Sequence, residues 1–300
     1  MTVPYFPVDG RPWRLRMGLR PLDPAEWLEV DERREAELRE KTRLLEEAHG
    51  RVSVALPGAE TAGRELFDAV VAHLGRWHPG PLTNLPDGTV CDRASGAIGD
   101  PTSTHPVEAA ARLVQEDLCL LERRESSWIL TAACVCFPSR WDPASKLGLD
   151  VAGIHEPVPG YGDELAGPVD GFFDRLEVER PVWRLNWTLL DSPELHLPDP
   201  ASPAGGQTAE DLGERLWFRV ERQTLRRITE RPAVTFTIHT YVTRLGELVA
   251  NRPGAADALA STLATVPADT AAYKGWEGLI GPLVDWLEQE AAAHHLRPGG

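Results

Sequence analysis

Polar and aromatic side chains that could do chemistry are concentrated between residues 139 and 244. The most unusual stretch is RVERQTLRR (219–227), which reads as a strand with charged or polar groups on both faces. A period of two places Arg219, Glu221 and Gln223 on one face and Arg222, Thr224 and Arg226 on the other. Two polar faces on an interior strand cost free energy unless the groups are paired, and a buried anionic ligand would pair the arginines. The alternative is an edge strand with one solvated face.

Several common catalytic signatures are absent from the sequence, among them GxGxxG, GxxxxGK[ST], HExxH and GxSxG. The four cysteines include one CVC pair without a second CxxC, so neither a structural zinc nor an iron–sulfur cluster is expected. The N-terminus has early prolines and charges and no apolar signal core, so we expect free thiols in a cytoplasmic protein.

The formal net charge of −15 argues against nucleic acid and anionic membrane surfaces as partners. No stretch is apolar enough to span a bilayer. An acidic exterior would suit a cationic substrate or a basic protein partner, although most acidic proteins are simply soluble.

The periodicity predicts an α+β fold in one 300-residue domain, with helices first, then about five strands with inserted helices, then helices. Helices are predicted over 24–47, 61–77 and 139–155, a turn followed by a helix over 157–176, and further helices over 247–266 and 278–296. Asp142 would cap the third of these, with His155 at its far end. Strands are predicted over 117–123, 126–137, 181–190, 216–228 and 233–242, and a long loop over 192–213.

Several ordered blocks resemble the haem-dependent oxidative N-demethylase alpha subunits. The blocks are QEDLCLL (115–121), FPSRWDPASKLG (137–148), IHEPVPGY (154–161), RLNWTLLDSPELH (184–196), RVERQTLRR (219–227) and FTIHTY (236–241). The stretch 21–45 also resembles the family's N-terminal helix. The resemblance covers roughly residues 14–250 and is specific, because order and spacing are shared as well as residue types.

The resemblance implies a PAS-like antiparallel sheet that holds haem b, with its iron, in residues 115–245. Residues 1–114 would be an N-terminal helical extension and residues 246–300 C-terminal helices. The implied activity is O₂-dependent N-demethylation of a small secondary amine, which releases formaldehyde. Electrons would come from partner subunits that carry flavin and an iron–sulfur cluster.

A haem iron needs an axial ligand, usually a neutral imidazole. Three of the nine histidines lie in the region of the blocks. His155 is the first choice, because it ends a helix and precedes a rigid Pro-Val-Pro, although a histidine there could simply interact with the helix dipole. His196, in a proline-rich loop, and His239, which shares a strand face with Tyr241, are the alternatives.

The other roles implied by the resemblance fall on the same blocks. Arginines would bind the haem propionates, aromatic rings would wall the macrocycle, and polar groups would orient O₂ or substrate. The candidates for cofactor binding are Arg184, Arg222, Arg226, Trp141, Trp187, Asn186, Gln223 and Thr224, and those for catalysis are Glu221, Tyr241 and His239. For each of them the plain alternative is an ion pair, a solvated position or core packing.

A haem-binding sensor without turnover is the competing hypothesis. Such a sensor normally needs an output domain, and none is recognised in this chain.

Overall fold

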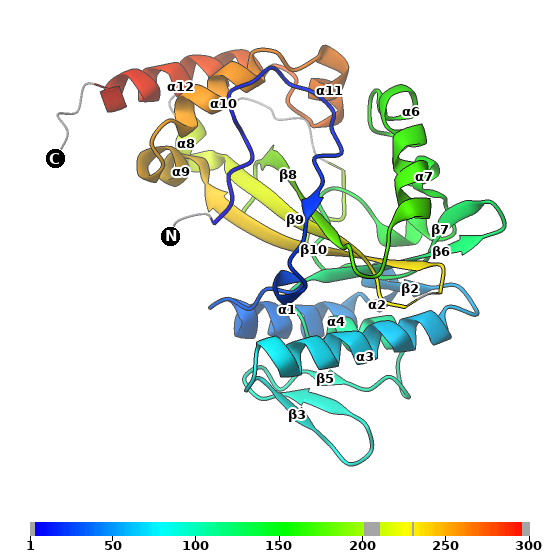
Figure 1. Ribbon diagram of the computed structural model, residues 1–300. Helices are drawn as coiled ribbons and strands as arrows, with labels where there is room; N and C mark the ends of the chain where they lie inside the picture. The colour runs from blue at the N-terminus through cyan, green and yellow to red at the C-terminus, as the bar shows by residue number, and fades with distance from the viewer. Residues whose placement is uncertain (1–3, 201–210, 230, 296–300) are drawn as a thin grey trace.

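The fold is built on a seven-stranded antiparallel sheet with the order β1-β8-β9-β10-β6-β7-β2 (Figure 1). The computed structural model describes residues 4–200, 211–229 and 231–295. The strands of this sheet are β1 (Arg20–Pro21), β2 (Ser53–Ala55), β6 (Asp117–Arg124), β7 (Ser127–Cys134), β8 (Val182–Leu190), β9 (Trp217–Arg227) and β10 (Ala233–Arg244). A second, three-stranded sheet contains β3 (Leu82–Asn84), β4 (Val90–Asp92) and β5 (Ile98–Gly99).

Helices precede, interrupt and follow the long strands, so the predicted α+β class is confirmed. Before β6 lie the 3-10 helix η1 (Pro24–Glu26) and α1 (Arg34–Glu47), α2 (His49–Val52), α3 (Glu60–Trp77) and α4 (Pro106–Ala111). Between β7 and β8 lie η2 (Pro143–Lys146), α5 (Val151–Ile154), α6 (Tyr161–Glu164) and α7 (Ala166–Arg175). The remaining helices are α8 (Leu212–Arg215), α9 (Leu245–Asn251), α10 (Ala255–Leu263), α11 (Ala268–Tyr273) and α12 (Ile280–His295).

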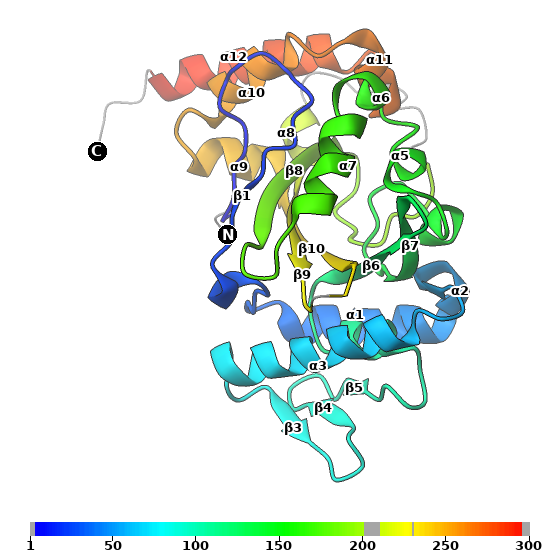
Figure 2. The ribbon, with the colours of Figure 1, turned by 45° about the vertical axis from the view of Figure 1, so that its right-hand side comes forward.

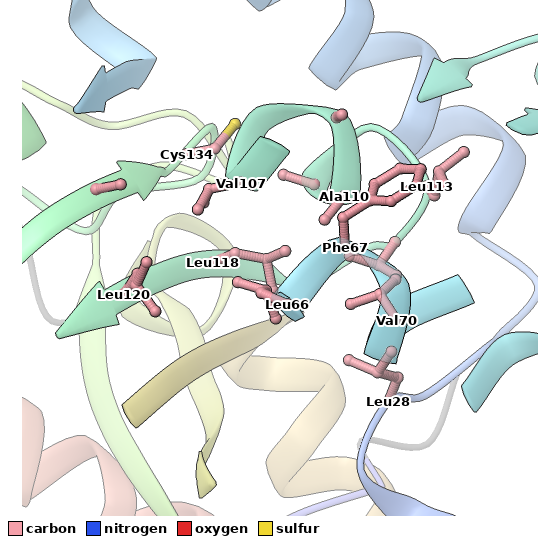
Figure 3. Packing of buried hydrophobic residues seen from close by; sticks show 14 of the residues in the cluster. Leu28, Leu66, Phe67, Val70, Val107, Ala110, Leu113, Leu118, Leu120 and Cys134 are labelled. Atoms are coloured by element: carbon pink, nitrogen blue, oxygen red, sulfur yellow. The ribbon is translucent and has the colours of Figure 1, made fainter. Parts of the chain in front are cut away.

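One face of the large sheet, here called the N-terminal face, is covered by the segment that precedes β6. Leu118 and Leu120 of β6 point to this face and belong to one hydrophobic cluster with Leu66 and Val70 of α3. Figure 3 shows Leu118 beside Leu66. The side chains of an extended strand alternate between faces, so the same face carries Thr224 of β9 and His239 of β10.

The opposite face, here called the α5–α7 face, carries the other half of each strand. Figure 2 shows α5, α6 and α7 on this side of the sheet. Leu121 and Leu225 pack there with Tyr161 of α6 and Phe173 of α7. A third cluster joins the sheet end near Phe218 to α9, α10 and α12.

The strand predictions are confirmed except at the end of β7, which stops at Cys134 instead of reaching Phe137. The helix predicted from residue 61 is also confirmed, as α3. The loop predicted over 192–213 lies partly outside the described residues. The small sheet of β3, β4 and β5 was not predicted, because its strands are only two or three residues long.

Three predicted helices are broken into shorter pieces. The helix predicted over 247–266 divides into α9 and α10 at Gly254, whose φ is 77°. The helix predicted over 24–47 divides into η1 and α1, because Trp27 and Leu28 between them are drawn fully into the core. The helix predicted over 139–155 divides into η2 and α5 at Gly148, whose φ of 81° is incompatible with a right-handed helix.

A fully buried lysine joins α1 to the start of β6. Lys41 Nζ donates to the carbonyl of Val114 over 3.0 Å and to that of Glu116, and it lies 3.7 Å from Asp117 Oδ1. The Asp117 carboxylate also accepts the backbone N–H groups of Cys136 and Phe137. This buried pair therefore fixes the chain that leaves β7 toward the 139–155 segment.

We predict that Lys41→Met lowers the free energy of unfolding by about 3–5 kcal/mol, because it leaves Asp117 and two carbonyls without their buried cation. Denaturant unfolding followed by circular dichroism measures the loss. Arg39→Met on the same helix is the control, since Arg39 and Glu35 form an exposed pair worth at most about 1 kcal/mol. Equal losses in the two variants would contradict this reading.

Candidate functional site

The strand register divides the sequence-predicted site residues between the two faces of the sheet. Asn186 of β8 pairs with Glu221 of β9, and Arg184 pairs with Gln223, so these four share the α5–α7 face. The N-terminal face carries Trp187, Arg222, Thr224, Arg226, His239 and Tyr241. A ligand on one face therefore contacts only one of these two sets.

On the α5–α7 face the Glu221 carboxylate is held by its neighbours in the sheet. Its Oε2 accepts from Gln223 Nε2 at 3.0 Å and from Asn186 Nδ2 at 3.3 Å, and Arg219 Nε lies 3.5 Å from Oε1. The residue is 7% exposed. These contacts fix the orientation of a buried anion in the middle of the sheet.

Arg219 connects this strand to two of the sequence blocks. Its guanidinium is completely buried and donates to the carbonyls of Phe137 and Leu195. His196 lies in the same pair of loops, where its Nδ1 is 2.8 Å from the carbonyl of Cys136. Arg219 thus serves as a tie between loops and sheet, and one nitrogen of His196 is engaged by the backbone.

His155 caps the C-terminal end of α5, and its ring is held from two directions. Its Nδ1 lies 2.8 Å from the carbonyl of Val151, which can only accept, so Nδ1 carries the proton and Nε2 keeps its lone pair. The ring stacks on Tyr161, with centroids 4.5 Å apart and planes 9° apart. Burial lowers the pKa of His155, and the charges of Arg184 and Lys146 lower it further. A neutral imidazole with a free Nε2 is the form that binds a metal.

Two buried donors near His155 are left unsatisfied. Tyr161 Oη and Arg184 Nε are both buried, and neither has a hydrogen-bond partner among the described residues. Burial lowers the pKa of Arg184, and Glu221 and Tyr161 only partly offset that effect. Burial raises the pKa of Tyr161 to about 12, so its hydroxyl remains a donor at neutral pH. A bound group with acceptor atoms would satisfy both donors.

The strand that carries Arg184 is also partly exposed to solvent. Residues 182–188 of β8 all remain partly exposed, whereas most of β9 and β10 is buried. Trp141, partly buried, packs against the same hydrophobic cluster as Tyr161. The α5–α7 face therefore combines a potential metal ligand and unpaired donors with a partly exposed strand.

Tyr161 was not among the predicted site residues, although it closes the block IHEPVPGY. The sequence signal that could have identified Tyr161 is the glycine that directly precedes it. Gly160 adopts φ 77°, which only glycine does at little cost, and this turn returns the chain so that Tyr161 faces His155.

On the N-terminal face the predicted residues bind the segment that precedes α1. Arg222 donates to the carbonyls of Glu26 and Trp27 and lies 3.4 Å from Glu29, whose carboxylate accepts from Tyr241 Oη. The other three have neighbours within the protein: Thr224 bonds Thr237, Arg226 lies over the Trp27 ring, and Trp187 stacks on Phe218 and Trp276. These contacts provide the structural role that the sequence analysis held as the alternative.

His239 is the centre of a buried ionic network on this face. Its Nδ1 lies 3.1 Å from Glu116 Oε1, and its Nε2 lies 3.8 Å from Asp31 Oδ2. Burial alone lowers the pKa of His239, but the nearby carboxylates of Asp31 and Glu116 outweigh it and raise the pKa to about 9. The ring is therefore a cation at neutral pH, which is not the form that ligates iron.

We predict that stability falls as pH rises through this titration. The raised pKa stabilises the folded protein fully below about 6.5, the pKa of an unfolded histidine, and the contribution of about 3 kcal/mol is lost as pH rises to about 9. Unfolding free energies of the wild type and of His239→Gln, measured from pH 6 to 10, test this. The variant should be less stable at pH 6 and have a flatter profile, and parallel profiles would contradict the assignment.

Two features are absent from the described ranges. No group of three or more His, Cys, Asp and Glu side chains there is arranged to hold a metal ion. No helix in that part of the chain is long and apolar enough to cross a membrane. A haem iron requires only one or two protein ligands, so the first result does not bear on a haem site.

The residues that form both faces of the large sheet lie within the match to a single protein family. The model for haem-dependent oxidative N-demethylase, alpha subunit-like, matches residues 18–282, which is well over half of the chain. The family's name indicates dependence on haem, and an alpha subunit implies other subunits in a complex. The chain belongs to the haem-dependent oxidative N-demethylase alpha subunit-like family.

Proposed function

We propose that this chain binds haem b on the α5–α7 face and uses it, with O₂, to demethylate a small secondary amine. The observation that carries the proposal is that a neutral His155 lies near two buried donors without partners among the described residues, Tyr161 Oη and Arg184 Nε. Membership of a family named for haem-dependent N-demethylation supports it. Formaldehyde is the second product.

The residues present on this face fit a haem. His155 Nε2 would ligate the iron, Arg184 would pair with a propionate, and Trp141 would lie against the macrocycle. When bound, the haem would supply the activation of O₂ that oxidises the N-methyl carbon. His196, whose Nδ1 also bonds a backbone carbonyl and leaves Nε2 free, remains an alternative ligand. His239 is the other alternative, but it is a cation between two carboxylates.

The protein's own part is to bind and orient the amine. A secondary amine is a cation at neutral pH, and Glu221 is a buried carboxylate held by two side-chain amides. An ammonium N–H donated to Glu221 would be strengthened by exclusion of water. Asn186 and Gln223 then orient Glu221, whereas Arg222, Arg226, Thr224 and Tyr241 hold the opposite face.

We also propose a PAS-like architecture with redox partners. Five long antiparallel strands with helices inserted between β7 and β8 support it, with residues 1–114 and 246–300 as extensions of a 115–245 core. The N-terminal extension is not purely helical, because it adds β1 and β2 to the edges of the sheet. Because oxidation by O₂ consumes electrons, a partner subunit that carries flavin and an iron–sulfur cluster would deliver them.

We predict that haem titrated into the full-length protein gives a Soret band with 1:1 stoichiometry. His155→Ala should abolish or strongly weaken it, because the iron loses its ligand, while His196→Ala and His239→Gln should retain it. Absorption spectra at each haem addition measure this outcome. Retained binding in His155→Ala with loss in His196→Ala would move the ligand to the 195–197 loop.

We predict that the haem-loaded protein, given a surrogate reductase and O₂, releases formaldehyde from secondary amines. Glu221→Gln should lower kcat/KM about ten- to hundredfold by removing a charged hydrogen bond, with the Soret band unchanged. Glu65→Gln on α3, beneath the opposite face, is the matched control. Haem binding without formaldehyde from a broad amine panel would favour a sensor that does not turn over.

A further inference from the structure

The ring of Tyr161 forms a parallel stack with the imidazole of His155. The centroids are 4.5 Å apart, the planes differ by 9°, and Tyr161 is only 5% exposed. Together with the 2.8 Å contact from Nδ1 to the Val151 carbonyl, the stack leaves His155 little freedom to rotate. One contact fixes which nitrogen carries the proton, and the other fixes the plane of the ring.

The backbone between the two rings is built to keep them in contact. Val158 N–H donates to the His155 carbonyl over 2.9 Å, and Tyr161 N–H donates to the Val158 carbonyl over 3.1 Å. Pro157 and Pro159 stiffen this segment, and the left-handed turn at Gly160 follows. The stack therefore depends on two consecutive turns within seven residues and does not need distant parts of the fold.

The hydroxyl of Tyr161 is not explained by packing. It is buried among the side chains of the α5–α7 cluster without a hydrogen-bond partner in the described parts of the chain. Phenylalanine would give the same stack without the cost of desolvating a hydroxyl. Arg184, whose buried Nε also has no partner among the described residues, lies close enough to influence Tyr161 electrostatically.

We infer that Tyr161 is a positioning residue for the haem proposed above. Its ring sets the plane of the His155 imidazole, and its hydroxyl donates a hydrogen bond to an oxygen of the bound haem, alongside Arg184. The inference rests on the proposed function, because it assigns Tyr161 a role only toward a group that His155 ligates. The ring and the hydroxyl have separate effects, so two substitutions at one position separate them.

The test uses full-length, haem-loaded protein with Tyr161→Phe, Tyr161→Leu and a control, Trp128→Leu. Trp128 belongs to the same cluster, but its ring packs on Phe173. Haem affinity is measured by Soret titration, and the iron–histidine bond by its Raman band in the ferrous protein. Circular dichroism reports folding, and Tyr161→Met replaces the leucine variant if that variant does not fold.

We expect Tyr161→Phe to weaken haem binding about tenfold, through the lost hydrogen bond to a charged group, and to keep the iron–histidine band. Tyr161→Leu should weaken binding and also shift or broaden the band, because the imidazole plane is no longer fixed. The control should change neither. A wild-type band in Tyr161→Leu would overturn the role of the ring, and wild-type affinity in Tyr161→Phe would overturn that of the hydroxyl.

Failure of the proposed function has a different signature. In that case the wild type binds no haem, or His155→Ala keeps the iron–histidine band. This inference alone would be overturned by a different set of results. The wild type would show the band, His155→Ala would lack it, and the Tyr161 variants would match the wild type in haem affinity and in the band.

Discussion

The fold depends on pairing the polar groups that alternate along β9. This interior strand carries arginine or glutamate on both faces, and burial makes each unpaired group costly. Arg219 is paired by hydrogen bonds to the carbonyls of Phe137 and Leu195, in two loops beside the sheet. Arg222 is paired by hydrogen bonds to the carbonyls of residues 26 and 27. The sheet and the segments on either side of it are therefore assembled around the same few buried charges.

The polar groups of the two faces have different neighbours. On the N-terminal face, Arg222 and Tyr241 bind partners in the segment before α1, and His239 is held by Asp31 and Glu116. On the α5–α7 face, Arg184 Nε and Tyr161 Oη stay unpaired beside a neutral His155, where β8 is partly open. Buried polar atoms without partners among the described residues occur on both faces, among them Arg222 Nε, Arg226 Nε and His239 Nε2 on the N-terminal face. On the α5–α7 face they lie beside a neutral imidazole and a partly exposed strand, a combination typical of a binding site.

Much of this arrangement could be predicted from the sequence. Runs rich in β-branched and apolar residues, bounded by turns, predicted the five long strands. The alternation within RVERQTLRR separated Glu221 from Arg222 correctly. The pattern could not say which face would be occupied by the protein itself, because the partners of Arg222 and His239 lie some 120 to 200 residues earlier in the chain. The breaks at Trp27 and Gly148 were missed for related reasons, since tertiary burial and a left-handed turn override helical periodicity.

The central claim is that the ligand site lies on the α5–α7 face. A crystal structure of the full-length protein loaded with haem tests it most directly. We predict iron bound to His155 Nε2, with Arg184 and Tyr161 in contact with haem oxygens and the His239 network intact. Haem on the N-terminal face, or iron bound to His196 or His239, would contradict the account.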